Sequence, residues 1–142
     1  LYNSFRTGAV DIAYQTFDPQ QVESLKQQAT SKGWQAIEEK SNTVTHMILN
    51  VKQKPLDQLE VRQAIASIID RPLLVQRVYQ NQAQPLYSML PDTFDSYKPV
   101  FQSAYGDGNV KKVTALLAKA GYTKENPLKL QVVYPGYSLI RE

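Results

Sequence analysis

The sequence predicts an α/β fold, and three observations lead to it. Apolar residues recur at helical spacing, above all between residues 61 and 69. Residues 10–14 and 128–134 instead alternate apolar with polar or small side chains, which is typical of strands. The chain has 142 residues, enough to bury the core of one domain. The resulting order is strand, helix, strand, strand, helix, helix, loop, helix, strand, which favours a layered α/β arrangement.

The first elements follow from turn and cap signals. Residues 1–7 suit the tail of a helix, because Gly8 can adopt the left-handed conformation that closes one. After the strand expected at 10–14, Asp18 can cap the free N–H groups of a second helix, and Pro19 suits its first turn. Gly33 ends that helix.

Two extended segments are expected next, at 34–39 and 44–51. In the second segment, alternation divides the side chains between two faces. His46 and Ile48 lie on one face together with Val44 and Asn50. The other face carries Thr45, Met47, Leu49 and Val51.

The clearest helix begins near residue 61. Its apolar stripe consists of Val61, Ala64, Ile65, Ile68 and Ile69. Other faces take Arg62, Gln63 and Ser67. Asp70 can cap a following helix with Pro72 in its first turn, so Asp70 and Arg71 are interpreted as a cap and an exposed ion pair.

Residues 81–108 are rich in proline and aromatic residues, and this aromatic content predicts that the segment packs onto the rest of the protein. A turn is expected at Gly106-Asp107-Gly108. Asn109 can then cap a last helix, which Gly121 closes before the strand at 128–134.

Composition and missing motifs exclude several classes of function. Lys and Arg number 16 against 13 Asp and Glu, without a block of like charges, so nucleic acid is not predicted as a partner. With no Cys and a single His, thiolate nucleophiles and Cys- or His-rich metal sites are excluded. No phosphate-binding glycine loop and no G-x-S-x-G elbow occur. The sequence therefore predicts neither an enzyme nor a bound cofactor or metal.

One block of residues is more specific than the rest. It runs from Asn50 through Pro55-Leu56-Asp57 to Val61-Arg62-Gln63-Ala64-Ile65 and Ile69-Asp70-Arg71. Weaker matches are Gly8-Ala9-Val10-Asp11-Ile12-Ala13, Pro85-Leu86-Tyr87-Ser88 and Ala115-Leu116-Leu117 with Ala120-Gly121-Tyr122. In this order, and over nearly the whole chain, they resemble the family 5 solute-binding proteins of bacterial ABC importers. Leu49 departs from the family's usual aromatic residue, Ile68 from its Ala and Lys119 from its Glu.

This resemblance implies a type II periplasmic-binding-protein fold, in which two α/β lobes enclose the ligand. Residues 1–142 then form a single partial domain, an incomplete C-terminal lobe with a mixed sheet flanked by helices. The sequence begins with Leu1 rather than Met, and residues 137–142 look like the start of a further helix. We therefore expect a piece of a longer protein whose N-terminal lobe is missing.

The resemblance also implies ligand-binding residues. His46 and Ile48 stand four and two places before Asn50, where peptide-binding members line the pocket. Tyr134, Tyr137 and Ser138 stand where a strand ends and a helix begins, which is the usual place for ligands in open α/β sheets.

The function so implied is that of the substrate-binding component of an ABC importer. It would capture a peptide or a related small solute between its lobes and deliver it to a membrane permease, in the periplasm or outside the cell, free or tethered to the membrane. Two alternatives stay open: the ligand-sensing domain of a transcription regulator, and a stand-alone interaction module. For the isolated chain we expect no saturable peptide binding, because it supplies one side of the clamp, and homodimerisation through unpaired strand edges.

Overall fold

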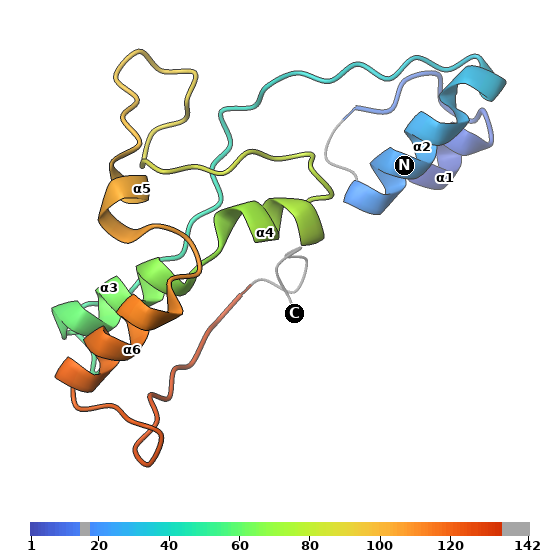
Figure 1. The fold of residues 1–142 in the computed structure, drawn as a ribbon. Coiled ribbons are helices and arrows are strands. Elements are labelled where there is room, and N and C mark those ends of the chain that lie inside the picture. The colour runs from blue at the N-terminus through green and yellow to red at the C-terminus, as the bar shows by residue number, and fades with distance from the viewer. Residues whose placement is uncertain (15–17, 135–142) are drawn as a thin grey trace.

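The computed structural model describes residues 1–14 and 18–134, and this part of the chain forms six α-helices and no β-strand. The helices are α1 (Tyr2–Arg6), α2 (Pro19–Lys32), α3 (Leu59–Ile68), α4 (Arg71–Arg77), α5 (Val100–Tyr105) and α6 (Val110–Lys119). Figure 1 shows α1 and α2 at one end of the molecule, α3 and α6 at the other, and α4 between them. Among the described helices, none has the length and apolar character needed to cross a membrane.

Local signals set the helix ends as expected. Asp18, Asp70 and Asn109 cap α2, α4 and α6, and their side-chain oxygens accept hydrogen bonds from backbone N–H groups two or three residues further on, at 2.8, 2.8 and 3.0 Å. Gly33 closes α2 in the left-handed conformation with φ 68°. These predictions are confirmed, because each depends only on residues close together in the sequence.

The N-terminal helices form a small unit of their own. The hydroxyl of Tyr2 donates to Ser24 Oγ at 3.0 Å, and the rings of Phe5 and Trp34 lie 4.9 Å apart between centroids. These contacts hold α1 against α2 and the residues that follow it.

The expected mixed sheet is not confirmed in the described residues. Segments 10–14, 34–39, 44–51 and 128–134 carry the predicted alternation, yet none of them pairs as a strand. A strand obtains its backbone hydrogen bonds from a neighbouring strand, and a two-stranded pair alone is marginally stable. Apolar side chains on these segments consequently face solvent: Ile12 is 81%, Ile48 83% and Val133 88% exposed.

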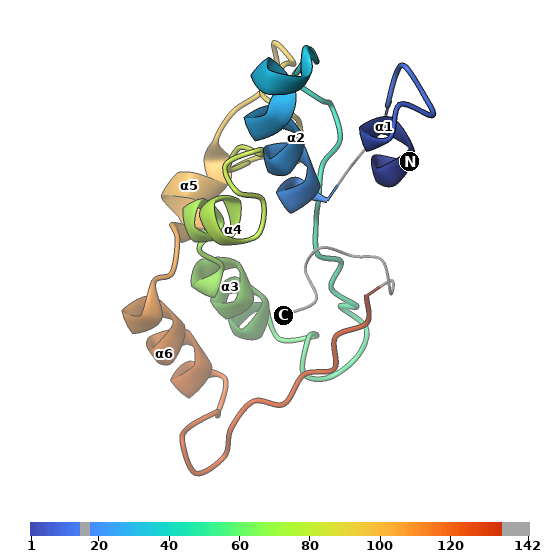
Figure 2. The ribbon, with the colours of Figure 1, turned by 90° about the vertical axis from the view of Figure 1, so that its right-hand side faces the viewer.

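The core lies where α3 packs on α6, as Figure 2 shows. Val61 and Ala64 are buried there, as predicted. Two expectations are wrong: Ser67 is fully buried instead of facing another side, and Ile68 is 44% exposed instead of lying in the core. Positions 61, 64 and 67 lie three apart and form one inclined row on α3, and its two small side chains allow α6 to approach closely. The N–H of Asn109 donates to the Ser67 carbonyl at 2.9 Å, joining the start of α6 to the end of α3.

The accessible surface shows how limited this core is. The chain exposes 11136 Å², whereas a compact protein of 16.1 kDa exposes roughly 7,400 Å² by the usual scaling of surface with mass. Figure 1 shows long extended connections between the two ends of the molecule, and such segments add surface without adding core. Burial is thus concentrated around α3, α6 and the residues packed beside them.

Candidate functional site

The predicted ligand-binding residues His46 and Ile48 lie on the exposed side of segment 44–51. His46 is exposed, and Ile48 is 83% exposed. The opposite side of the segment faces the helices: Leu49 and Val51 line a cleft against α3 and α5. Thr45 Oγ1 and Tyr79 Oη, just beyond α4, are hydrogen-bonded at 3.2 Å. These contacts distinguish Leu49, which is half-buried, from Ile48, although Thr45 and Val51 also remain exposed.

The remaining predicted site residues are not brought to this face by any described contact. Tyr134 is 48% exposed at the end of segment 128–134, and among the described residues no hydrogen bond or ring contact links it to His46 or Ile48. Tyr137 and Ser138 lie outside the described residues.

The cleft beneath segment 44–51 has a volume of about 340 Å³. Its floor and walls combine aliphatic, aromatic and guanidinium groups. They come from Leu49, Val51, Leu59, Arg62, Gln63, Ala66, Arg71, Phe101 and Tyr105. Apolar residues of the segment and of α3 meet in this cleft, so it lies between the segment and the helices. His46 and Ile48 are not among the residues that line it.

A polar network borders the cleft and was not foreseen from the sequence. Asp107 Oδ2 accepts a hydrogen bond from the Tyr87 hydroxyl at 2.7 Å. Asp107 Oδ1 accepts from the Arg71 backbone N–H at 3.1 Å and from Arg71 Nη1 at 3.3 Å. The guanidinium of Arg71 also donates to the Gly106 carbonyl at 3.2 Å and lies 5.3 Å from the centre of the Tyr87 ring.

Burial and hydrogen bonding shift the titration of this network. Burial and the hydrogen bond to Asp107 raise the pKa of Tyr87 to about 12. Burial alone would raise the pKa of Asp107, but hydrogen bonds from Tyr87 and Arg71 outweigh it and hold the pKa of that carboxyl below its ordinary value. At neutral pH the network is therefore a neutral phenol, a carboxylate and a guanidinium.

The prediction that Asp70 and Arg71 form an exposed ion pair is wrong. Asp70 caps α4, as predicted, but Arg71 pairs with Asp107, and the two paired side chains are only 16% and 20% exposed. The pairing depends on a turn 36 residues away in sequence, so adjacency in the chain was misleading. The one signal available was an acidic residue between two glycines, Gly106 and Gly108.

The network also anchors the two ends of the aromatic segment 81–108, so the packing prediction is confirmed there, whereas Phe94 in its middle is 47% exposed. The Tyr87 carbonyl accepts a hydrogen bond from the N–H of Phe101 at 2.9 Å. Tyr87 thereby ties α5 to the start of α4, and Phe101 and Tyr105 of α5 form the aromatic wall of the cleft.

The most specific sequence block has structural roles here. Val61 and Ala64 form the core, Asp70 caps α4, and Arg71 joins the network. Arg62, expected at the surface, is half-buried, and its Nη1 donates to the carbonyls of Leu56 and Asp57, both at 2.9 Å. These residues shape the scaffold that carries segment 44–51.

Comparison with known proteins identifies the class to which this scaffold belongs, that of bacterial solute-binding proteins. Residues 1–140 match the family described as "Bacterial extracellular solute-binding proteins, family 5 Middle". The chain therefore belongs to this family, and its sequence resemblance is confirmed.

Relatives in the family carry names of binding proteins for different solutes. Heme-binding protein A of Haemophilus influenzae is 32% identical over 71% of this chain and 18% of its own length. The periplasmic oligopeptide-binding protein OppA of the same organism is 25% identical over 92% of the chain and 24% of its length. The nickel-binding protein NikA of Staphylococcus aureus is 38% identical over 54% of the chain and 15% of its length. The chain thus spans a quarter or less of these relatives, and no solved structure matches it.

Proposed function

We propose that this chain is part of the C-terminal lobe of an ABC-importer receptor, which binds a peptide or a related small solute between two lobes and delivers it to a membrane permease. Membership of family 5 supports this proposal. So do the relatives named as oligopeptide- and dipeptide-binding proteins. The periplasmic location in the name of one such relative supports a site of action outside the cytoplasm.

The observation that carries the proposal is the two-sided character of segment 44–51. On one side Leu49 is half-buried and lines the cleft against the helices together with Val51, which keeps 52% of its surface exposed. The other side presents an imidazole and an aliphatic side chain, His46 and Ile48, to the exterior. A side chain that hydrogen-bonds next to one that packs is the combination with which binding clefts fix the polar and apolar parts of a ligand.

Within this proposal His46 and Ile48 contact the solute, together with Tyr134, Tyr137 and Ser138. Closure of a second lobe over them would remove water from the solute and complete its contacts. Because a second lobe would supply the remaining contacts, the 142-residue chain alone is expected to show no saturable binding of di-, tri- or oligopeptides in calorimetry.

The test uses the longer receptor that contains this segment. Calorimetry with peptides of two to five residues, Ni²⁺ and heme establishes which solute binds, and His46→Ala is then compared with Met47→Ala. Met47 is the matched control because it neighbours His46, is exposed and lies on the other predicted face. Loss of a hydrogen bond to the solute should weaken binding about five- to tenfold for His46→Ala and leave Met47→Ala near wild type. Equal affinities of both variants would remove His46 from the site, and binding of none of these solutes would contradict the proposed function.

A further inference from the structure

Asp107 and Gly108 form the one Asp-Gly dipeptide in the sequence. An aspartyl residue before glycine is chemically reactive, because glycine has no side chain to shield its backbone nitrogen. Gly108 lies in the turn between α5 and α6 with φ 56°, and a Cβ placed on it would lie 3.3 Å from Asp70 Oδ2. The turn therefore favours glycine at this position, and with it the reactive dipeptide.

The reaction open to this dipeptide is succinimide formation. The backbone nitrogen of Gly108 attacks Cγ of the protonated Asp107 carboxyl, an N–Cγ bond forms, and the carboxyl hydroxyl leaves as water with the hydrogen of that nitrogen. Water then opens the ring at either carbonyl, which restores aspartate or gives isoaspartate, whose backbone runs through the former side-chain methylene. Among the described residues, the N–H of Gly108 has no hydrogen-bond acceptor, so the nucleophile is not engaged.

The polar network restrains the other reactant. Ring closure requires the Asp107 side chain to turn onto its own backbone. Its Oδ2 is held by the Tyr87 hydroxyl at 2.7 Å, and its Oδ1 by the backbone N–H and the guanidinium of Arg71 at 3.1 and 3.3 Å. Although burial opposes them, these donors also hold the pKa of Asp107 below its ordinary value, so the protonated carboxyl that reacts is scarce at neutral pH. Both effects slow the reaction while the network is closed.

We propose that Asp107–Gly108 is a site of isoaspartate formation, which hydrogen bonds from Tyr87 and Arg71 keep unreactive in the folded protein. Isomerisation lengthens the backbone by one methylene close to Asn109. The side chain of Asn109 caps α6, and its N–H donates to the Ser67 carbonyl at 2.9 Å. The modified chain therefore loses the fit that joins α6 to the end of α3. This modification site does not depend on the proposed function as a solute receptor.

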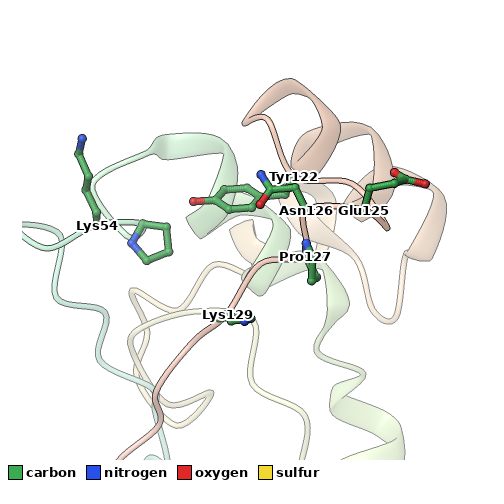
Figure 3. Close-up of a pocket in the computed structure, with 7 residues that line it drawn as sticks. Lys54, Tyr122, Glu125, Asn126, Pro127 and Lys129 are labelled. Atoms are coloured by element: carbon green, nitrogen blue, oxygen red, sulfur yellow. The ribbon is translucent and has the colours of Figure 1, made fainter.

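The loop after α6 provides an internal control. Figure 3 shows Asn126 and Pro127 in the wall of a cleft of about 500 Å³. Asn126 is exposed, but proline carries no backbone N–H, so the same ring closure cannot occur there. No isoaspartate is expected at Asn126 under the conditions that modify Asp107.

The test is peptide mapping of the longer receptor that contains this segment, incubated at neutral pH either folded or in urea. Succinimide and isoaspartate at Asp107 should accumulate at least about tenfold faster in urea, since in the folded protein several hydrogen bonds must open first. In the folded receptor, Tyr87→Phe should speed the reaction about fivefold, because one hydrogen bond to the carboxylate is lost.

The matched control is Tyr79→Phe, which removes a phenolic hydroxyl outside the network, hydrogen-bonded to Thr45 Oγ1 at 3.2 Å. Its rate should equal that of wild type, with circular dichroism used to verify that both variants are folded. Should Tyr87→Phe fail to fold, the folded and urea-unfolded wild type still decide the question. The proposal is overturned if these two react equally fast, if no isoaspartate forms at Asp107 in urea, or if Tyr79→Phe accelerates the reaction as much as Tyr87→Phe.

Discussion

Replacing Asp107 by Ala removes the acceptor at the centre of the polar network. The variant loses the hydrogen bond from Tyr87 at 2.7 Å and those from Arg71 at 3.1 and 3.3 Å. A hydrogen bond to a charged group contributes about 1.5–3 kcal/mol, but bonds to one carboxylate are not additive. The paired side chains are 16% and 20% exposed, so water replaces part of what is lost. We expect the free energy of unfolding to fall by about 2–4 kcal/mol.

Urea unfolding followed by far-ultraviolet circular dichroism measures this change. The matched control is Asp92→Ala, which breaks the exposed pair with Lys40 and should cost less than about 1 kcal/mol. A double-mutant cycle with Tyr87→Phe should give a coupling of about 1 kcal/mol between Tyr87 and Asp107. If Asp107→Ala costs no more than Asp92→Ala, or if the coupling is zero, the network does not hold α4 and α5 together.

The pH dependence of the same variant follows from the lowered pKa of Asp107 in the folded protein. The stability that the carboxylate contributes is complete above the unfolded pKa of about 3.9, and it is lost as the pH falls through the lower folded pKa. Wild type should therefore lose more stability in acid than Asp107→Asn does. Parallel acid-unfolding curves for the two proteins would contradict this reasoning.

Two further predictions concern a phenol and a hydroxyl. The pKa of Tyr87 is raised to about 12, so the free energy of unfolding should fall as the pH rises from about 10 to 12. The variant Tyr87→Phe should lack this part of the decrease. A phenolate absorbance titration in which no tyrosine titrates late would contradict the prediction. Ser67 Oγ is buried without a hydrogen-bond partner in the described structure. Ser67→Ala should therefore raise the free energy of unfolding, measured by urea unfolding, by about 1 kcal/mol. A decrease would mean that the hydroxyl does have a hydrogen-bond partner.

Helix ends were predictable because their causes are local. Asp18, Asp70 and Asn109 each cap a helix whose N–H groups lie within three residues, and Gly33 closes α2 by its own backbone conformation. The role of Asp107 was not predictable in this way. Its partners Tyr87 and Arg71 lie 20 and 36 residues away, and nothing in the spacing of those residues announces that a turn brings them together.

The extended segments also show which features depend on local sequence and which depend on distant residues. The alternation in segment 44–51 placed Leu49, which is half-buried, on the opposite face from Ile48, which is 83% exposed, since it depends only on the geometry of an extended backbone. Whether such a segment becomes a strand depends on a partner that can supply the ladder of hydrogen bonds. The described residues provide none, and the predicted sheet and its edge-mediated homodimer stay predictions.

The residues that indicate the family are different from those proposed to contact the solute. Arg62 holds the loop before α3, Val61 and Ala64 fill the core, and Arg71 anchors the aromatic segment. All of these contacts are made within the chain and build its scaffold. The match over residues 1–140 accordingly identifies the scaffold. Within the proposed function, side chains that the scaffold leaves exposed would select the solute. On segment 44–51 these include His46 and Ile48, where a substitution is expected to change ligand contacts without disturbing the core.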